Sequence, residues 1–328
     1  MSDTNKKPID AEALHKSAIV VDFHNDFLEE KRAKPEGMLA GNDLFQTDIP
    51  RLKKGGVDVQ FMVVWTKPDI ESPYLLGKQM VETLNEELAA NANEVELAKS
   101  YADIEAVLAK KKIAIILAVE GGYIIENSFE KLEWFYNQGA RYLTLTWNTG
   151  CDWIGGANEA DKRLTPFGKE VLNKLNELGM IVDLSHVNAQ SVDDVLNATD
   201  VTVVATHSGA HAINAHQRNL SDAHIKEIIA RGGVVGSVFY PYFLNGTDKA
   251  TIADVMKHIN HVRKLTGGVD GIAIGSDFDG IDITPEGLKD PSYFPNLTKA
   301  LLAEGYTAEE VEKILGKNIL RVFKKVCG

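Results

Sequence analysis

The sequence has little cysteine and no long apolar run. Its two cysteines, Cys151 and Cys327, belong to no CxxC pair, so neither a thiolate zinc site nor a disulfide framework is indicated. No apolar stretch is long enough to span a bilayer. Residues 1–20 lack the continuous apolar segment of a signal peptide. We therefore expect a cytoplasmic protein that has no membrane as a partner.

The chain also has no excess of basic residues. Its formal net charge is −12 at pH 7, and phosphate groups require a basic face, so nucleic acid is disfavoured as a partner. With 328 residues, of which 44% are apolar, the chain can bury one large core. Barrels of alternating strands and helices often reach this length as one unit, and we expect residues 1–328 to form a single domain.

What is present is a series of eight short apolar segments separated by helical patterns. They are rich in Val and Ile, and both sets of alternate positions are apolar, as in strands that are buried on both faces. The predicted strands are residues 18–24, 57–65, 113–120, 142–147, 180–186, 201–207, 233–240 and 271–279. Between two of them, Thr165-Pro166 opens a helix that Gly179 closes. Residues 72–109 form a longer helical region.

This alternation predicts an α/β fold, a (β/α)8 TIM-like barrel with extra helices and loops. A doubly wound open sheet is the alternative, but the chain lacks the glycine-rich phosphate turn that would follow its first strand. A long polar segment, residues 150–164, follows the fourth predicted strand. Loops at that end of a barrel usually carry function.

The carboxyl ends of the predicted strands carry imidazoles and carboxylates. They are His24, Asp26, Glu120, His186, His207 and Asp277. Each alone has a structural explanation, such as a hydrogen-bonded core histidine or a helix cap. In a barrel, however, all strand ends meet at one face. Carboxylates gathered there would repel one another and lose hydration, and a divalent cation removes that penalty, so the set indicates a metal site.

The donor types indicate which metal. Imidazole and carboxylate without thiolate suit Zn²⁺, with Mn²⁺, Co²⁺ and Fe²⁺ as alternatives. The five expected ligands, more than one tetrahedral site takes, are His24, Asp26, Glu120, His186 and His207. A carboxylate shared between two ions that lie ~3.5–4 Å apart fits better, and Glu120 is the candidate bridge. We expect two Zn²⁺ per chain.

These residues lie in segments that resemble the membrane dipeptidase family, the renal dipeptidase-like metallopeptidases. The matching segments run along nearly the whole chain: DFHNDF, VEGG, RYLTLTWN, LTPFGKEVLNKLNELGMIVDLSHV, THSGAHAINAHQRNLSD, IGSDFDG and LGKNILRVF. The resemblance implies an amidohydrolase-type barrel with a binuclear zinc centre. His24 and Asp26 would bind one zinc, and Glu120 would bridge the two. His186 and His207 would bind the other.

The resemblance also implies a substrate. The family's dipeptidases accept dipeptides, often with a D-residue at the C-terminal position. Arg218 matches the arginine that binds the terminal carboxylate, and Asp277 matches the acidic residue at the end of the last strand. Animal members have a histidine, thought to contact the reacting carbonyl, where this chain has Trp147. We expect Trp147 to form an apolar wall of the substrate pocket, because an indole only donates and cannot replace an imidazole.

We therefore predict that the protein is a zinc dipeptidase. A hydroxide that bridges two metals attacks the peptide carbonyl, Asp277 passes a proton to the leaving amine, and Arg218 pairs with the substrate carboxylate. A deaminase, a lactonase or a TatD-like nuclease on the same barrel remains open, although TatD-like nucleases open with HxH instead of His24-Asn25-Asp26. A catalytically silent barrel used for binding is the alternative from another class. The sequence leaves the oligomeric state open, and a homodimer is one candidate.

Overall fold

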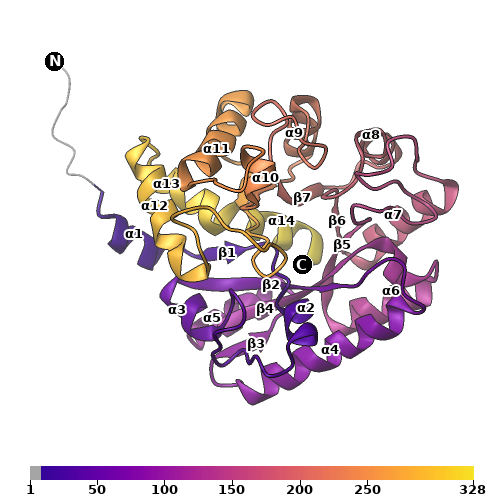
Figure 1. Ribbon diagram of the computed structural model, residues 1–328, viewed down its shortest axis with the longest axis horizontal. Helices are drawn as coiled ribbons and strands as arrows, with labels where there is room; N and C mark the ends of the chain where they lie inside the picture. The colour runs from indigo at the N-terminus through magenta and orange to yellow at the C-terminus, as the bar shows by residue number, and fades with distance from the viewer. Residues whose placement is uncertain (1–8) are drawn as a thin grey trace.

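The computed structural model describes residues 9–328, and expectations about residues 1–8 lie outside it. Eight parallel strands pair in the order β1-β2-β4-β5-β6-β7-β8-β9. Backbone hydrogen bonds join the two ends of this row: Phe23 N–H donates to Ile274 O at 3.0 Å, and Asp277 N–H donates to His24 O at 3.2 Å. The row thus forms a nearly closed barrel surrounded by helices (Figure 1), which confirms the predicted (β/α)8 class.

All eight predicted strands are present, most of them shorter than predicted. They are β1 (Val20–Asp22), β2 (Val57–Trp65), β4 (Ile113–Glu120), β5 (Ala140–Thr144), β6 (Ile181–Asp183), β7 (Val203–Ser208), β8 (Val235–Ser237) and β9 (Ile272–Ile274). The predictions 180–186 and 271–279 ran too far because His186 and Asp277 have left-handed backbones, which a β-ladder does not accommodate.

One strand was missed. β3 (Val95–Leu97) lies within residues 72–109, which were predicted to be helical, and it separates α4 (Pro73–Ala90) from α5 (Tyr101–Ala109). It pairs with the first residues of β4, where β5 does not reach. Three residues are too few to show a period of two, so the sequence carried no strand signal there.

The remaining helices cover the barrel and its ends. They are α1 (Ala11–Ser17), α2 (Phe27–Ala33), α3 (Ile49–Lys54), η1 (Gly122–Ile125), α6 (Phe129–Gln138), α7 (Pro166–Leu178), α8 (Ala189–Ala198), α9 (Asp222–Ala230), α10 (Pro241–Leu244), α11 (Ile252–Thr266), η2 (Pro291–Tyr293), α12 (Phe294–Ala303), α13 (Ala308–Glu312), the π-helical η3 (Lys313–Lys317) and α14 (Asn318–Cys327). Thr165 caps α7 by accepting from Gly168 N–H, and Gly179 ends it with a φ of 69°, as predicted. No helix within residues 9–328 combines the length and apolarity needed to cross a membrane.

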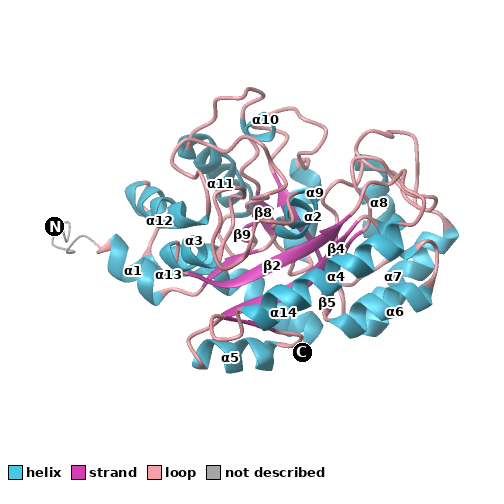
Figure 2. Ribbon diagram, turned by 60° about the horizontal axis from the view of Figure 1, so that its bottom comes forward, coloured by secondary structure: helices cyan, strands magenta, loops and turns pink. Residues whose placement is uncertain are grey.

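Helix α14 closes the amino-terminal end of the barrel. Its Phe323 ring lies 6.0 Å from the ring of Phe61 in the barrel interior. Its Arg321 donates to the carbonyls of Gly232 and Asp270, which lie shortly before β8 and β9. Figure 2 shows α14 and α10 on opposite sides of the strands. The carboxyl ends of the strands therefore form the face at which a site can open.

Candidate metal centre

Glu120 is the last residue of β4 and continues the inward phase of that strand. Ala114, Ile116 and Ala118 belong to the inner core cluster, and Glu120 follows at the same spacing of two. A strand that fills the barrel with apolar side chains thus ends by placing a carboxylate at the barrel mouth. This carboxylate is buried, with 3% of the residue exposed.

Two other residues of the candidate site owe their direction to an unusual backbone. His186 and Asp277 follow β6 and β9 by three residues and have φ values of 68° and 66°. Residues other than glycine rarely adopt this left-handed conformation, and it concentrates where a side chain must be held in one direction. Here it directs His186 toward Glu120 and Asp277 toward His24.

One half of the cluster, here called the carboxylate side, consists of His24, Asp26 and Asp277. His24 Nε2 lies 3.3 Å from Asp26 Oδ2 and 3.8 Å from Asp277 Oδ1. The ligand atoms of all three residues lie within 4.8 Å of one another, close enough to hold one ion. The three come from opposite ends of the chain and meet where β1 and β9 close the barrel.

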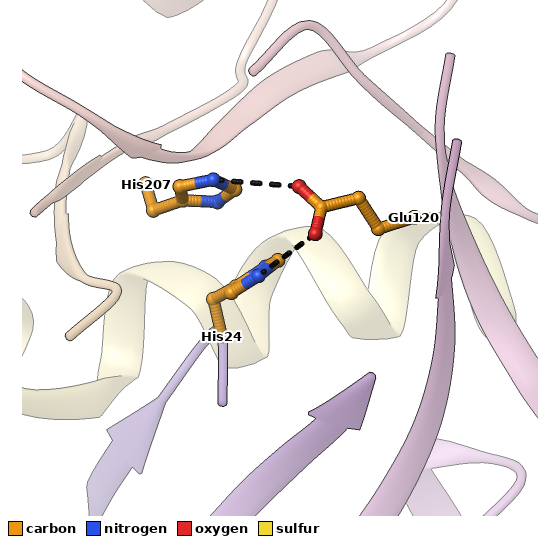
Figure 3. Close-up of side chains that lie close together, drawn as sticks. All are labelled: His24, Glu120 and His207. Carbon is orange, nitrogen blue, oxygen red and sulfur yellow. Dashed lines mark ion pairs between the residues drawn. The ribbon is translucent and has the colours of Figure 1, made fainter. Parts of the chain in front are cut away.

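The other half, here called the imidazole side, consists of His186 and His207. Their Nε2 atoms lie 2.8 Å apart, and Glu120 Oε1 lies 2.9 Å from His186 Nε2 and 3.6 Å from His207 Nε2. The second oxygen of Glu120, Oε2, lies 3.6 Å from His24 Nε2 on the carboxylate side. Figure 3 shows His24 and His207 each facing one oxygen of Glu120. One carboxylate therefore faces both halves.

The three imidazoles present the same nitrogen to the centre because their other nitrogen is occupied. His24 Nδ1 lies 2.8 Å from Tyr142 Oη, His186 Nδ1 lies 2.9 Å from Asn148 Oδ1, and His207 Nδ1 lies 2.8 Å from Thr206 Oγ1. Within residues 9–328, His24 Nε2 and Glu120 Oε1 have no hydrogen-bond partner, although both atoms are buried. Outer nitrogens held by neighbours and inner nitrogens turned toward one carboxylate are typical of metal-ligating histidines, so the residues fit a metal centre.

The electrostatics of the two halves differ. Burial raises the pKa of Asp277 well above its usual value, and Asp26 and Glu120 add to the rise. Burial likewise raises the pKa of Asp26. On the imidazole side, burial and the charge of Arg218 lower the pKa of His186 to about 4, and burial also lowers that of His207. Burial opposes ionisation of Glu120 too, but His186 and His24 outweigh it and lower its pKa.

A cavity of about 360 Å³ opens onto this cluster. Glu120, His186 and Asp277 line its floor, and Trp147 lines its wall together with Trp65, whose ring centroid lies 5.1 Å from that of Trp147. Trp65 was not singled out from the sequence, because an aromatic residue at the end of an apolar strand reads as core. The cavity is large enough for a small molecule, and its wall is aromatic.

Arg218 lies next to the imidazole side but lines a second, neighbouring cavity. The residue is 4% exposed, and its Nη2 donates to His207 O at 3.3 Å. Its guanidinium lies 5.2 Å from the centre of the Phe243 ring. Within residues 9–328, no carboxylate lies within 4.0 Å of it and its Nε has no partner. A buried guanidinium without a counter-ion is costly, which favours an anionic ligand at this position.

Three contacts of this centre were missed from the sequence. Tyr142 contacts His24, Thr206 contacts His207, and Asn148 contacts His186 through Oδ1. Tyr142 and Thr206 are buried polar residues within strands, and that was the available signal. Which histidine each one would touch depends on the closed barrel.

Comparison with known proteins gives a consistent result. Residues 9–327 match the family model described as membrane dipeptidase, peptidase family M19. An uncharacterized dipeptidase of Schizosaccharomyces pombe is 34% identical over 94% of this chain and 81% of its own length.

Solved structures are similar over nearly the full chain. A dipeptidase described as a metallopeptidase of family M19 is 28% identical, with a TM-score of 0.87 over 95% of this chain and 99% of the other. A metallopeptidase of Rhodobacter sphaeroides, with a phosphinate mimic of the dipeptide L-Ala-D-Ala bound, is 27% identical, with a TM-score of 0.86 over 94% of this chain and 100% of the other.

Proposed function

This chain belongs to the membrane dipeptidase family, peptidase family M19, and is a metal-dependent peptide-bond hydrolase; from that premise we propose that it is a zinc dipeptidase with a binuclear centre. His24 and Asp26 would hold one zinc, His186 and His207 would hold the other, and Glu120 would be the carboxylate shared by both. The observation that carries this proposal is the position of Glu120, whose two oxygens face the two halves of the cluster. When bound, the metal ions supply Lewis acidity and activate water near neutral pH.

Asp277 is proposed to move the proton. Its Oδ1 lies 3.8 Å from His24 Nε2, and the residue lines the cavity at the cluster. Burial favours the protonated form of this carboxyl group. A raised pKa makes the ionised form a stronger base than usual, so ionised Asp277 beside the reacting water would accept a proton and then deliver it to the leaving amine.

Arg218 is proposed to bind the carboxylate at the C-terminus of the substrate. Its buried guanidinium has no acidic partner among the described residues, and a bidentate carboxylate would supply one. The relative that binds an L-Ala-D-Ala mimic supports a D-residue at the C-terminal position of the substrate. A clamp on the terminal carboxylate would also restrict the length of the peptide.

Trp147 is proposed to contact the substrate as part of the aromatic wall. Its ring lies 6.2 Å from that of His186, in a stacked orientation, and close to Trp65. An indole has no acceptor nitrogen, so Trp147 contributes shape and one N–H donor to the pocket. The expected cytoplasmic location and the oligomeric state stay predictions.

The proposal is tested with a substrate panel. We expect hydrolysis of L-Xaa-L-Xaa or L-Xaa-D-Xaa dipeptides, loss of that activity on chelation and its return with Zn²⁺. Lactones and nucleosides serve as the comparison, because related barrels act on them. Turnover of those compounds without dipeptide hydrolysis, or dipeptide hydrolysis that survives complete metal removal, would contradict the proposal.

The role of Arg218 has its own test. Arg218→Ala should lower kcat/KM for a free dipeptide by about 30-fold or more, since truncating one partner of a buried charge pair costs roughly 2–5 kcal/mol. Arg218→Lys keeps the charge but loses the bidentate geometry and is the matched control, with an intermediate loss expected. A dipeptide whose C-terminus is an amide should lose far less. Equal losses on both substrates would show that Arg218 does not hold the carboxylate.

A further inference from the structure

A buried carboxylate, Asp183, lies behind the imidazole side. One of its oxygens accepts hydrogen bonds from the hydroxyls of two threonines. Asp183 is the last residue of β6 and is fully buried. Its Oδ2 accepts from Thr144 Oγ1 at 2.6 Å and from Thr206 Oγ1 at 2.7 Å. Both hydroxyls act as donors in these contacts, so both hydroxyl protons point at Asp183. The backbone N–H of Thr206 donates to the other oxygen, Oδ1, at 2.8 Å.

Of these two threonines, only Thr206 contacts a candidate metal ligand. Its Oγ1 lies 2.8 Å from His207 Nδ1. A hydroxyl has one proton, and that of Thr206 is directed at Asp183, so Thr206 accepts in this contact and His207 Nδ1 donates. Ser185 Oγ lies 3.2 Å from the same hydroxyl but directs its own proton to Asp183 Oδ1 at 2.9 Å. The hydrogen-bond directions therefore determine which nitrogen of His207 carries the proton.

With the proton on Nδ1, Nε2 of a neutral His207 has a free lone pair. That atom faces Glu120 Oε1 at 3.6 Å and His186 Nε2 at 2.8 Å. A lone pair aimed into the cluster is the form that a metal ligand requires. The other two candidate histidines are anchored differently, since Tyr142 and Asn148 are neutral groups with no hydrogen bond to a buried carboxylate among the described residues.

We propose that Thr206, oriented by Asp183, is a positioning residue that fixes His207 in its ligand tautomer before a metal ion binds. The inference rests on the proposed metal centre and adds to it a chain of contacts from Asp183 through Thr206 to His207. Threonine suits this position because its hydroxyl donates to the carboxylate and accepts from the imidazole at once.

The test compares Thr206→Val with Thr144→Val in the full-length protein. Both variants remove one buried hydroxyl from the same oxygen of Asp183, and only the first leaves His207 Nδ1 without its acceptor. Zinc affinity is measured by competition with a chromophoric chelator, and stability by thermal unfolding of the metal-free proteins. Thr206→Val should weaken binding of one of the two zinc ions by about 10–100-fold, the range for lost partners of metal-ligating histidines. Thr144→Val should change it by less than about threefold, and Thr206→Ser should restore it.

Equal weakening in the two valine variants, in step with their loss of stability, would overturn the inference. A second measurement needs no variant: long-range ¹H–¹⁵N correlation of metal-free protein with ¹⁵N-labelled histidine at pH 8. His207 should carry its proton on Nδ1, and a proton on Nε2 would overturn the inference as well. If the wild-type protein binds zinc and hydrolyses dipeptides while these tests fail, only the role of Thr206 is wrong. If the wild type binds no zinc, the proposed function itself fails.

Discussion

The carboxylate side and the imidazole side of the cluster are built in opposite ways. His24, Asp26 and Asp277 come from the first and last strands and meet where the barrel closes. His186 and His207 come from neighbouring strands and are separated by 21 residues. Burial raises the pKa values of the acids on the first side and lowers those of the imidazoles on the second. The first side gathers acids whose ionisation burial opposes, whereas the second offers neutral donors.

This difference suggests a division of roles. Closely spaced buried carboxylates need a cation to offset their repulsion, so the carboxylate side supplies charge neutralisation. Neutral imidazoles need correct orientation more than charge, and the neighbours of His186 and His207 supply it. Glu120 lies between the two sides and contacts both. If the roles are divided in this way, the carboxylate side and the imidazole side both depend on Glu120.

The largest effect is expected for Glu120→Gln, which removes the negative charge shared by both halves. Binding of both zinc ions should weaken, and kcat/KM for a dipeptide should fall by at least about 10³-fold, because metal ions supply several kcal/mol of transition-state stabilisation and each 1.36 kcal/mol is a factor of ten. Metal content and steady-state kinetics check this. Retention of full activity with one zinc bound would mean that one half works alone.

The next effect separates Asp277 of the carboxylate side from Asp279, an acid two residues further along the chain. Asp277 and Asp279 are both 9% exposed and have nearly equal φ values of 66° and 67°, but only Asp277 approaches His24. Asp279 instead accepts from Gln46 N–H at 2.6 Å. Asp277→Asn should lower kcat by about 10²–10⁴-fold, the usual contribution of acid–base catalysis, with zinc still bound. Asp279→Asn should change kcat by less than about tenfold, and similar losses in both variants would remove the special role of Asp277.

The smallest effect concerns the stability of the metal-free protein. Burial raises the pKa of Asp279 to about 7, well above its value of about 4 in an unfolded chain. Between pH 4 and pH 7 the native state holds a proton that the unfolded state has released, so this residue makes stability fall as pH rises. His186, with a pKa lowered to about 4, acts in the opposite direction up to about pH 6.5.

Comparison of the wild type with Asp279→Asn isolates the acidic contribution, since His186 is common to both. In urea unfolding of metal-free protein, the variant should gain stability relative to the wild type between pH 4.5 and pH 8. An unchanged difference between the two proteins over that range would mean that Asp279 is ionised at both pH values.

The barrel was predictable because its strands have a clear sequence signal. Segments such as residues 113–120 are apolar on both phases, and only a sheet covered on both faces buries such a strand. The gathering of His24, Glu120 and His207 followed from the same reasoning, because parallel strands bring their carboxyl ends to one face. The short β3 was not predictable, since three residues carry no period.

The contacts that orient the candidate ligands could not be predicted from the sequence, for a different reason. His24 and Tyr142 are 118 residues apart, and their contact depends on the curvature of the closed barrel. Thr206 follows β7's apolar start and reads as an ordinary strand residue until Asp183 is seen to accept its hydroxyl proton. Backbone direction at His186 and Asp277 is likewise set by tertiary contacts, because even His and Asp adopt a left-handed φ in only a minority of positions.

The most direct test of the account is elemental analysis of the purified wild-type protein after growth with ample zinc, combined with a dipeptide assay of the same sample. The account predicts about two zinc ions per chain, and hydrolysis that disappears as they are removed. Protein that binds no zinc, or that loses all of its zinc without losing dipeptide hydrolysis, would contradict it.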